Sequence, residues 1–196
     1  MKPFAESSEQ NRQPIFNVIE LLLRDCQSVF EVGSGTGQHA VYFAADLPHL
    51  VWYTSDVSEN HAGIKQWIEE SGLQNVRQPV ELDTLKSQWP TMRVDAVFSA
   101  NTAHIMHWNE VEALFAGVGR LLNPGGKFTL YGPFNYAGQY TSESNARFDQ
   151  WLKNRDRGSG IRDFEALDEL AQMAGMQLAG DFQMPENNRI LYWLKT

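Results

Sequence analysis

Three alternate glycines directly after an apolar run are the part of this sequence with the clearest chemical potential. The run 28–32 carries one acid, Glu31, and passes into Gly33, Gly35 and Gly37 before a helical pattern begins. Glycine has no Cβ, so the backbone there can turn tightly and approach a ligand closely. The first turn of the following helix offers unpaired N–H groups and the positive end of its dipole. The segment therefore predicts a loop that binds a nucleotide-type cofactor.

The spacing of the glycines separates two cofactor classes. A dinucleotide loop follows the pattern G-x-G-x-x-G, which would place a glycine where this chain has Gln38. The pattern here is G-x-G-x-G, and it resembles motif I of class I S-adenosylmethionine (SAM)-dependent methyltransferases. The resemblance implies SAM as the cofactor and S-adenosylhomocysteine as its product. The residues that it assigns to cofactor binding in this loop are Glu31, Gly33, Ser34, Gly35, Thr36 and Gly37.

Acids also end the next two apolar runs. Asp56 follows the second run, where its two carboxylate oxygens could bind both ribose hydroxyls. Taken alone, Asp56 could equally cap a turn or a helix. Asp83 ends the third run, and the resemblance implies that it lies beside the adenine. The neighbouring Val57 and Thr84 are assigned to the same cofactor site.

Candidate catalytic residues follow the fourth and fifth runs. Asn101 and His104 come just after the run 94–100, at the sheet edge where open α/β folds bind ligands, and Asn101 is also a candidate cofactor ligand. Tyr131 ends the fifth run. SAM carries an activated methyl group, so the protein must mainly hold a nucleophile in line with it, and a base such as His104 helps when that nucleophile is a hydroxyl. The alternative for His104 is a packed side chain in a loop.

Two further segments are expected to cover the pocket. The N-terminal segment carries Arg12, which could pair with a carboxylate of cofactor or substrate, or lie free on the surface. The excursion 132–160 is rich in aromatic and amide side chains, which suit a small, partly apolar acceptor. His104 and His107 have an i, i+3 spacing, but no third ligand is obvious. We therefore expect no metal.

A narrower resemblance covers most of the chain. The sequence is similar to a small methyltransferase-like family of unknown function, the DUF938 or UPF0585 type. The segments that carry this resemblance are AESSEQNR at 5–12, SGTGQHAVYFA at 34–44, YGPF at 131–134 and MPENN at 184–188. It implies a SAM-binding fold and supplies no substrate.

Composition limits the partners and the number of domains. The chain has 196 residues, of which 42% are hydrophobic and 20% charged, so we expect one domain over 1–196. Within it, 1–25 is predicted to form an N-terminal arm and helix, and 132–162 a cap insertion. The net charge of −8 argues against a nucleic-acid partner, because such proteins neutralise phosphates with clustered Lys and Arg.

The cysteine content and the apolar runs of the sequence indicate the cellular compartment. Cys26 is the single cysteine, so no disulfide can form within the chain, which fits a reducing compartment. The N-terminus does not resemble a signal peptide, and no apolar run approaches the roughly 20 residues that span a bilayer. We expect a cytoplasmic protein with no membrane partner, and the oligomeric state is left open.

The order of apolar runs predicts the fold. Strands and helices alternate from 28 to 131, which favours βαβ units with a mostly parallel sheet. The runs 176–182 and 189–195 are too close for a crossover helix, so they are expected to form a hairpin with an antiparallel last strand. The fold class is therefore α/β, a Rossmann-like methyltransferase fold with seven strands in the order 3-2-1-4-5-7-6.

Two functions remain open from the sequence. The first is a SAM-dependent methyltransferase that acts on a small-molecule acceptor of unknown identity. The second is a methyltransferase-like SAM-binding module without turnover that works through a protein partner. A nicotinamide oxidoreductase is disfavoured both by the glycine spacing and by the antiparallel last strand.

Overall fold

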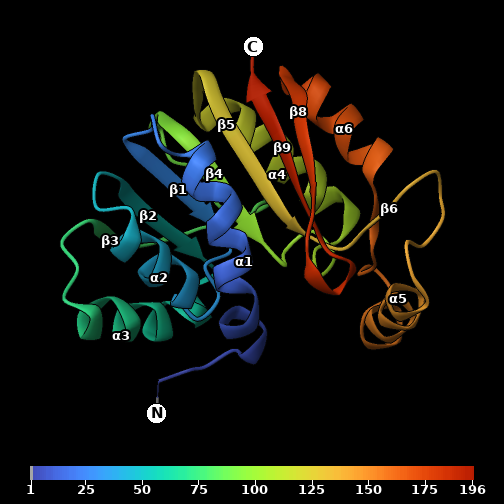
Figure 1. The fold of residues 1–196 in the computed structure, drawn as a ribbon, viewed down its shortest axis with the longest axis horizontal. Coiled ribbons are helices and arrows are strands. Elements are labelled where there is room, and N and C mark those ends of the chain that lie inside the picture. The colour runs from blue at the N-terminus through green and yellow to red at the C-terminus, as the bar shows by residue number, and fades with distance from the viewer. Residues whose placement is uncertain (1) are drawn as a thin grey trace.

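Seven strands form one central sheet in the computed structural model, which describes residues 2–196 (Figure 1). The order across the sheet is β3-β2-β1-β4-β5-β9-β8. The bounds are β1 Ser28–Val32, β2 Val51–Asp56, β3 Val76–Glu81, β4 Val94–Ala100, β5 Leu122–Gly132, β8 Met176–Gln183 and β9 Arg189–Lys195. Strands β1 to β5 are parallel, and β9 is antiparallel to both β5 and β8. The short strands β6 (Phe134–Asn135) and β7 (Arg162–Asp163) pair only with each other. Without these two, the order is 3-2-1-4-5-7-6, so the predicted fold class and the antiparallel last strand are confirmed.

Helices cover both faces of the sheet (Figure 1). One face carries α1 (Glu6–Leu22), α2 (Gln38–Asp46) and α3 (His61–Ser71), and the other carries α4 (Trp108–Leu121) and α6 (Phe164–Met173). Helix α5 (Glu143–Arg155) lies beyond the sheet, at the lower right of Figure 1, on the side where β5 ends and β9 begins. Two short 3₁₀ turns, η1 (Ser58–Asn60) and η2 (Pro185–Asn187), complete the elements.

The alternation of side chains along each strand divides the core into two layers. In β4, Val97 packs with the α4 and α6 side, whereas Ala96 and Phe98 pack with the α1, α2 and α3 side. Phe43 and Phe98, whose ring centroids are 5.5 Å apart, lie in the second layer, and neither ring is exposed. Because both faces are buried, β1 and β4 are near-continuous apolar runs, which is why the sequence signals them clearly.

The parallel strands bring the predicted site residues to one edge. The carboxyl ends of β1, β2, β4 and β5 all point toward the lower side of Figure 1, where the N-terminal segment and α5 also lie. The glycine loop, Asp56 and Asn101 each follow or end one of these strands. The topology therefore places residues far apart in the sequence around a common crevice.

The first helix differs from its prediction. The sequence pattern predicts a helix over 14–24, whereas α1 begins at Glu6 and ends at Leu22. Proline is common in the first turn of a helix, but Pro14 lies inside α1, where its missing N–H group removes one backbone hydrogen bond. Glu6 and Glu9 stabilise the earlier start because acids in the first turn interact favourably with the helix dipole.

Two other local predictions are wrong. Strand β3 begins at Val76 rather than at residue 80, because it is an edge strand whose exposed polar residues and Pro79 hide its pattern. The sequence pattern also predicts a helix over 163–174 that Asp163 caps and Gly175 ends; Asp163 does precede α6, but its side chain makes no capping hydrogen bond. Gly175 does adopt the predicted left-handed conformation after α6, with φ +74°.

Candidate functional site

The glycine loop after β1 has a backbone that requires glycine. Gly33, Gly35 and Gly37 have φ values of +74°, +58° and +91°. A Cβ on Gly33 would lie 2.5 Å from Cγ2 of Thr102, and one on Gly37 would lie 3.0 Å from Cα of Ile64. The loop thus combines left-handed backbone with close approach to neighbouring chain segments.

The Gly33→Ala substitution is expected to destabilise the fold by about 3 kcal/mol, from left-handed strain plus overpacking against Thr102. Gly72→Ala provides the matched control, because Gly72 has φ +67° and nothing lies within 4 Å of the position that its new methyl group would take. That control should lose only about 1 kcal/mol from backbone strain. Urea denaturation of both variants measures the difference, and equal losses would contradict the close contact with Thr102.

A cavity of about 600 Å³, here called the donor cavity, follows this loop along the sheet edge. Its walls come from the glycine loop, the ends of β2 and β4, and the N-terminal segment. The predicted cofactor residues that line it are Gly33, Ser34, Gly35, Thr36, Asp56, Val57, Asp83, Thr84 and Asn101. Gly37 shapes the loop from behind this cavity, and Glu31 and Arg12 do not line it.

Asp56 connects the loop to the end of β2. Its Oδ2 accepts a hydrogen bond from Gly35 N–H at 2.7 Å, and its Oδ1 accepts from Val57 N–H and from Asn60 Nδ2, both at 2.8 Å. Each carboxylate oxygen has further acceptor capacity. Asp56 therefore orders the loop and still presents an anionic oxygen pair to the cavity.

The donor cavity is acidic. Asp56, Glu59, Asp83 and Glu110 line it, and no Lys or Arg does. His39 also lines it, but burial lowers its pKa to about 4, so the imidazole is neutral at pH 7. Such a cavity attracts a cationic sulfonium compound and repels the diphosphate of a dinucleotide. The residues present therefore fit SAM better than NAD.

Glu31 lies beneath the loop with its carboxyl group buried. It accepts hydrogen bonds from Ser34 Oγ at 2.9 Å and from Trp52 Nε1 at 3.2 Å. Burial raises its pKa to about 7, opposed by these two hydrogen bonds, and the nearby Asp56 charge raises it further. Glu31 thus supports the loop through Ser34 rather than reaching the cavity itself.

Two other predicted residues have local partners. Asp83 Oδ1 accepts from Leu85 N–H and Lys86 N–H, both at 3.1 Å, and Lys86 Nζ lies 2.8 Å from its Oδ2, so the pKa of Asp83 is lowered. Arg12 pairs with Glu9 at 2.5 Å, and its guanidinium lies 4.5 Å from the ring centroid of Tyr42. Asp83 still lines the donor cavity, whereas Arg12 does not.

A second cavity of about 550 Å³, here called the acceptor cavity, adjoins the first. Its walls come from α1, the loop after β4, the start of the segment after β5, α5 and the turn η2. The two cavities share Ser7, Asn101 and Ile105. All three candidate catalytic residues, Asn101, His104 and Tyr131, line the acceptor cavity.

His104 is a neutral imidazole facing this cavity. The residue is 7% exposed, and its ring makes no hydrogen bond within residues 2–196. Burial lowers its pKa to about 4, and the charges of Arg162 and Arg155 lower it further. Its ring packs edge-on against Phe148, with centroids 5.3 Å apart. Burial also raises the pKa of the nearby Tyr131 hydroxyl, so both groups are uncharged at neutral pH.

Asn101 stands where the two cavities meet. Its φ of +59° is left-handed, a conformation that asparagine tolerates better than most residues, and its N–H donates to Tyr131 O at 2.9 Å. The unusual backbone turns the chain sharply at the end of β4. This turn lets one short loop line both cavities.

Sequence reasoning missed three residues around the donor cavity. Gln38 Oε1 accepts from Ala5 N–H at 2.6 Å and from Thr36 Oγ1 at 2.9 Å, tying the N-terminal segment to the glycine loop. His39 Nε2 donates to Asn11 Oδ1 at 2.7 Å. Gln38 stands where a dinucleotide loop has glycine, so a polar residue there was the available signal. Asn11 lies in the segment 5–12 that carries the family resemblance, but nothing in the sequence indicated its contact with His39.

The N-terminal segment forms one wall of the donor cavity. Trp67 Nε1 donates to Pro3 O at 2.8 Å, and the Lys2 ammonium lies 3.6 Å from the centroid of the Trp67 ring. Pro3 and Ala5 both line the cavity. Residues 2–5 are therefore held between α2 and α3 beside the donor cavity.

Neither a membrane-spanning helix nor a metal cluster is found in the part of the chain that the structure describes. Among residues 2–196, no helix is both long and apolar enough to cross a bilayer. In the same residues, His, Cys, Asp and Glu side chains form no group of three or more that could hold a metal ion.

The fold is that of the class I SAM-dependent methyltransferases. The chain superposes on an O-methyltransferase family protein from Burkholderia thailandensis with a TM-score of 0.85 at 15% identity, over 97% of this chain and 58% of that one. The apo structure of the methyltransferase SibL gives 0.82 at 20% identity, over 96% and 55%. Human N-acetylserotonin methyltransferase in complex with SAM gives 0.80 at 16% identity, over 97% and 53%. The chain spans little more than half the length of these proteins.

The family is shown by a separate comparison. Residues 2–195 match the family described as "Protein of unknown function (DUF938)". The chain therefore belongs to the DUF938 family, as the sequence resemblance implied.

Proposed function

We propose that this protein is a SAM-dependent methyltransferase that acts on a small-molecule acceptor. The observation that carries the proposal is the pair of adjoining cavities that share Asn101 and Ile105. One cavity is acidic and borders the glycine loop, and the other has a largely uncharged lining with aromatic side chains. A methyl donor and an acceptor bound in the two cavities would meet beside Asn101.

Different residues of the donor cavity would bind different parts of the cofactor. The N–H group of Thr36 makes no hydrogen bond within residues 2–196, so it is free to bind the amino-acid carboxylate. Asp56 would accept hydrogen bonds from the ribose hydroxyls, and the adenine would lie toward Val57, Asp83 and Thr84. SAM supplies an activated methyl group, so the protein's main contribution is orientation and exclusion of water. The N-terminal segment and the cap insertion 132–162 would provide that cover.

His104 would act on the acceptor. Its ring lines the acceptor cavity and makes no hydrogen bond within residues 2–196, so a ring nitrogen is free to accept the proton that a hydroxyl nucleophile loses. Several similar structures are named O-methyltransferases, and one from Planctomyces limnophilus is described in complex with apigenin. Small aromatic hydroxyl compounds are therefore the first acceptors to test.

Addition of SAM is expected to raise the melting temperature, whereas NAD is not. At a hundredfold excess over the dissociation constant, a ligand stabilises the folded state by about 2.7 kcal/mol, or roughly 5–10 °C in a domain of this size. Thermal denaturation with each compound measures the shift. No shift with millimolar SAM would reject the proposal.

Turnover needs a separate measurement. Incubation of the protein with methyl-labelled SAM and a panel of phenols, amines and carboxylic acids should label a hydroxyl compound. The Asp56→Ala variant serves as the control for transfer that does not depend on the protein. SAM binding without labelling of any acceptor, in metabolite extracts as well, would favour the alternative of a binding module that acts through a partner.

A further inference from the structure

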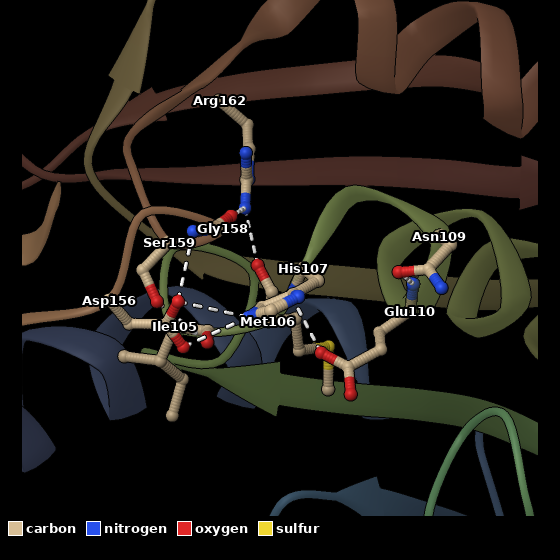
Figure 2. Close-up of polar contacts among 9 residues, drawn as sticks. All are labelled: Ile105, Met106, His107, Asn109, Glu110, Asp156, Gly158, Ser159 and Arg162. Atoms are coloured by element: carbon tan, nitrogen blue, oxygen red, sulfur yellow. Dashed lines mark hydrogen bonds and ion pairs between the residues drawn. The ribbon is translucent and has the colours of Figure 1, made fainter.

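Five consecutive residues after β4, at 103–107, are bonded to one segment after α5, and Figure 2 shows the contacts of Ile105, Met106 and His107. Arg162 Nε donates to Ala103 O at 3.1 Å, Gly160 N–H donates to His104 O at 2.9 Å, and Ser159 Oγ donates to Ile105 O at 3.0 Å. Arg162 also donates to Met106 O, and His107 Nε2 lies 2.9 Å from Asp156 Oδ2. We call this set of contacts, between residues 103–107 and 156–162, the seam.

Arg162 is the central residue of the seam. Its guanidinium donates to three carbonyls, those of Ala103, Met106 and Gly158, and it forms no ion pair within residues 2–196. The side chain is partly buried, and this burial lowers the pKa of the guanidinium. Burying a cation without a carboxylate partner is costly, and only hydrogen bonds of this number and geometry offset that cost. The arrangement is specific to the rigid fork of arginine.

The seam joins the walls of both cavities. On one side, Ile105 and Met106 line the donor cavity, and His104 and Ile105 line the acceptor cavity. On the other side, the segment 156–162 follows directly from α5, which contributes Phe148 and other residues to the acceptor cavity. Residues 103–107 therefore form a shared wall whose position depends on the segment that closes the cap.

We propose that Arg162 is a positioning residue for methyl transfer, because it fixes the shared wall 103–107 against the cap and thereby holds both cavities in register. The inference rests on the proposed function and adds to it a residue that touches neither cofactor nor acceptor. Without the fork of Arg162, two carbonyls of the shared wall lose their partner at once. The wall then loosens, His104 becomes accessible to water, and the donor cavity loses the fixed positions of Ile105 and Met106.

The test uses three variants of the full chain and two measurements. Arg162→Gln removes both the charge and the fork, and Arg162→Lys keeps the charge but removes the fork. Arg157→Gln is the matched control, because Arg157 is an exposed arginine of the same segment that makes no contact in the seam. The first measurement is the NMR titration of His104 between pH 4 and 8, with its resonance assigned from His104→Gln. The second is the dissociation constant of SAM by calorimetry.

The expected result separates positioning from charge. In the wild type and in Arg157→Gln, His104 should stay neutral above pH 5, since burial, Arg162 and Arg155 all disfavour its protonation. In Arg162→Gln and in Arg162→Lys, it should titrate near its ordinary value of about 6.5. Both Arg162 variants should bind SAM at least tenfold more weakly than the wild type. A titration of His104 in Arg162→Lys that matches the wild type would mean that only the charge matters, and would overturn the inference.

A folding defect in the Arg162 variants must be separated from a loss of positioning. Melting curves show whether the Arg162 variants fold. If those variants do not fold, Ser159→Ala is measured in their place, because it removes only the hydrogen bond to Ile105 O. That variant should weaken SAM binding severalfold and raise the fraction of protonated His104 at pH 5. Failure of the wild type to bind SAM would reject the proposed function, whereas unchanged titration and affinity in folded variants would reject the role of Arg162.

Discussion

Replacement of Asp56 by alanine is expected to weaken SAM binding by more than a hundredfold. The substitution removes the carboxylate that would bind two ribose hydroxyls, and hydrogen bonds to charged groups contribute about 1.5–3 kcal/mol each. It also releases the N–H groups of Gly35 and Val57, so the glycine loop loses its anchor to β2. Calorimetric titration with SAM measures the loss.

His104→Ala is the comparison for Asp56→Ala. His104 lines the acceptor cavity and not the donor cavity, so its removal should change SAM affinity by less than threefold. Methyl transfer to a hydroxyl acceptor should nevertheless fall by about 10²-fold or more, because the proton acceptor is lost. Equal losses of SAM affinity in the two variants would show that the two cavities are wrongly assigned.

Glu31→Gln is expected to remove a strong pH dependence of stability. The carboxyl group ionises near pH 4.5 when unfolded and near pH 7 when folded, so the folded state binds its proton more tightly. The stability that Glu31 contributes should therefore fall as the pH rises from about 4.5 to 7, by up to about 3 kcal/mol, while the buried His39 and His104, whose pKa values are lowered, make stability rise over part of the same range. Glutamine carries no charge at any of these pH values, so the variant should lack this fall.

Urea denaturation at pH 5 and pH 8 tests the Glu31 prediction. The quantity to compare is the difference between the two pH values, since an amide also changes the hydrogen bonds to Ser34 and Trp52 equally at both. Glu81→Gln is the control, because Glu81 is an exposed glutamate at the end of β3. If the change in stability from pH 5 to pH 8 were the same in the wild type and in Glu31→Gln, Glu31 would have no raised pKa in the folded protein.

The sheet was predictable because its central strands are buried on both faces. Strands such as β1 and β4 are mostly apolar, and a two-residue period assigns their side chains to opposite layers. The hairpin at the end was predictable from the short distance between its strands. The edge strand β3 gave no such signal, since most of its side chains are exposed.

The glycine loop was predictable for a different reason. A left-handed backbone leaves a mark in the sequence, because Gly33, Gly35 and Gly37 have few substitutes. The direction of a side chain leaves no such mark. Glu31 lies only two residues before the loop but points beneath it, and Arg12 faces Tyr42 because α1 is already helical there.

The seam could not be predicted at all. Residues 103–107 contribute five hydrogen-bonding groups to the seam, and four of them are main-chain carbonyls. Any residue type supplies a carbonyl, so these positions carry no signal in the sequence. Arg162 in the sequence resembles Arg155 and Arg157, which stand in the same polar stretch. Only the fold shows which of the three arginines is turned inward.

The acidity of the donor cavity would have a consequence for the catalytic cycle that we propose. At neutral pH, SAM carries one net positive charge, and its product carries none once the methyl group has left. Asp56, Glu59, Asp83 and Glu110 therefore attract the incoming compound more strongly than the spent one. In such a cycle, loss of the methyl group would itself weaken the electrostatic attraction between the cavity and the bound compound. Each turnover would therefore favour exchange of the product for a new molecule of SAM.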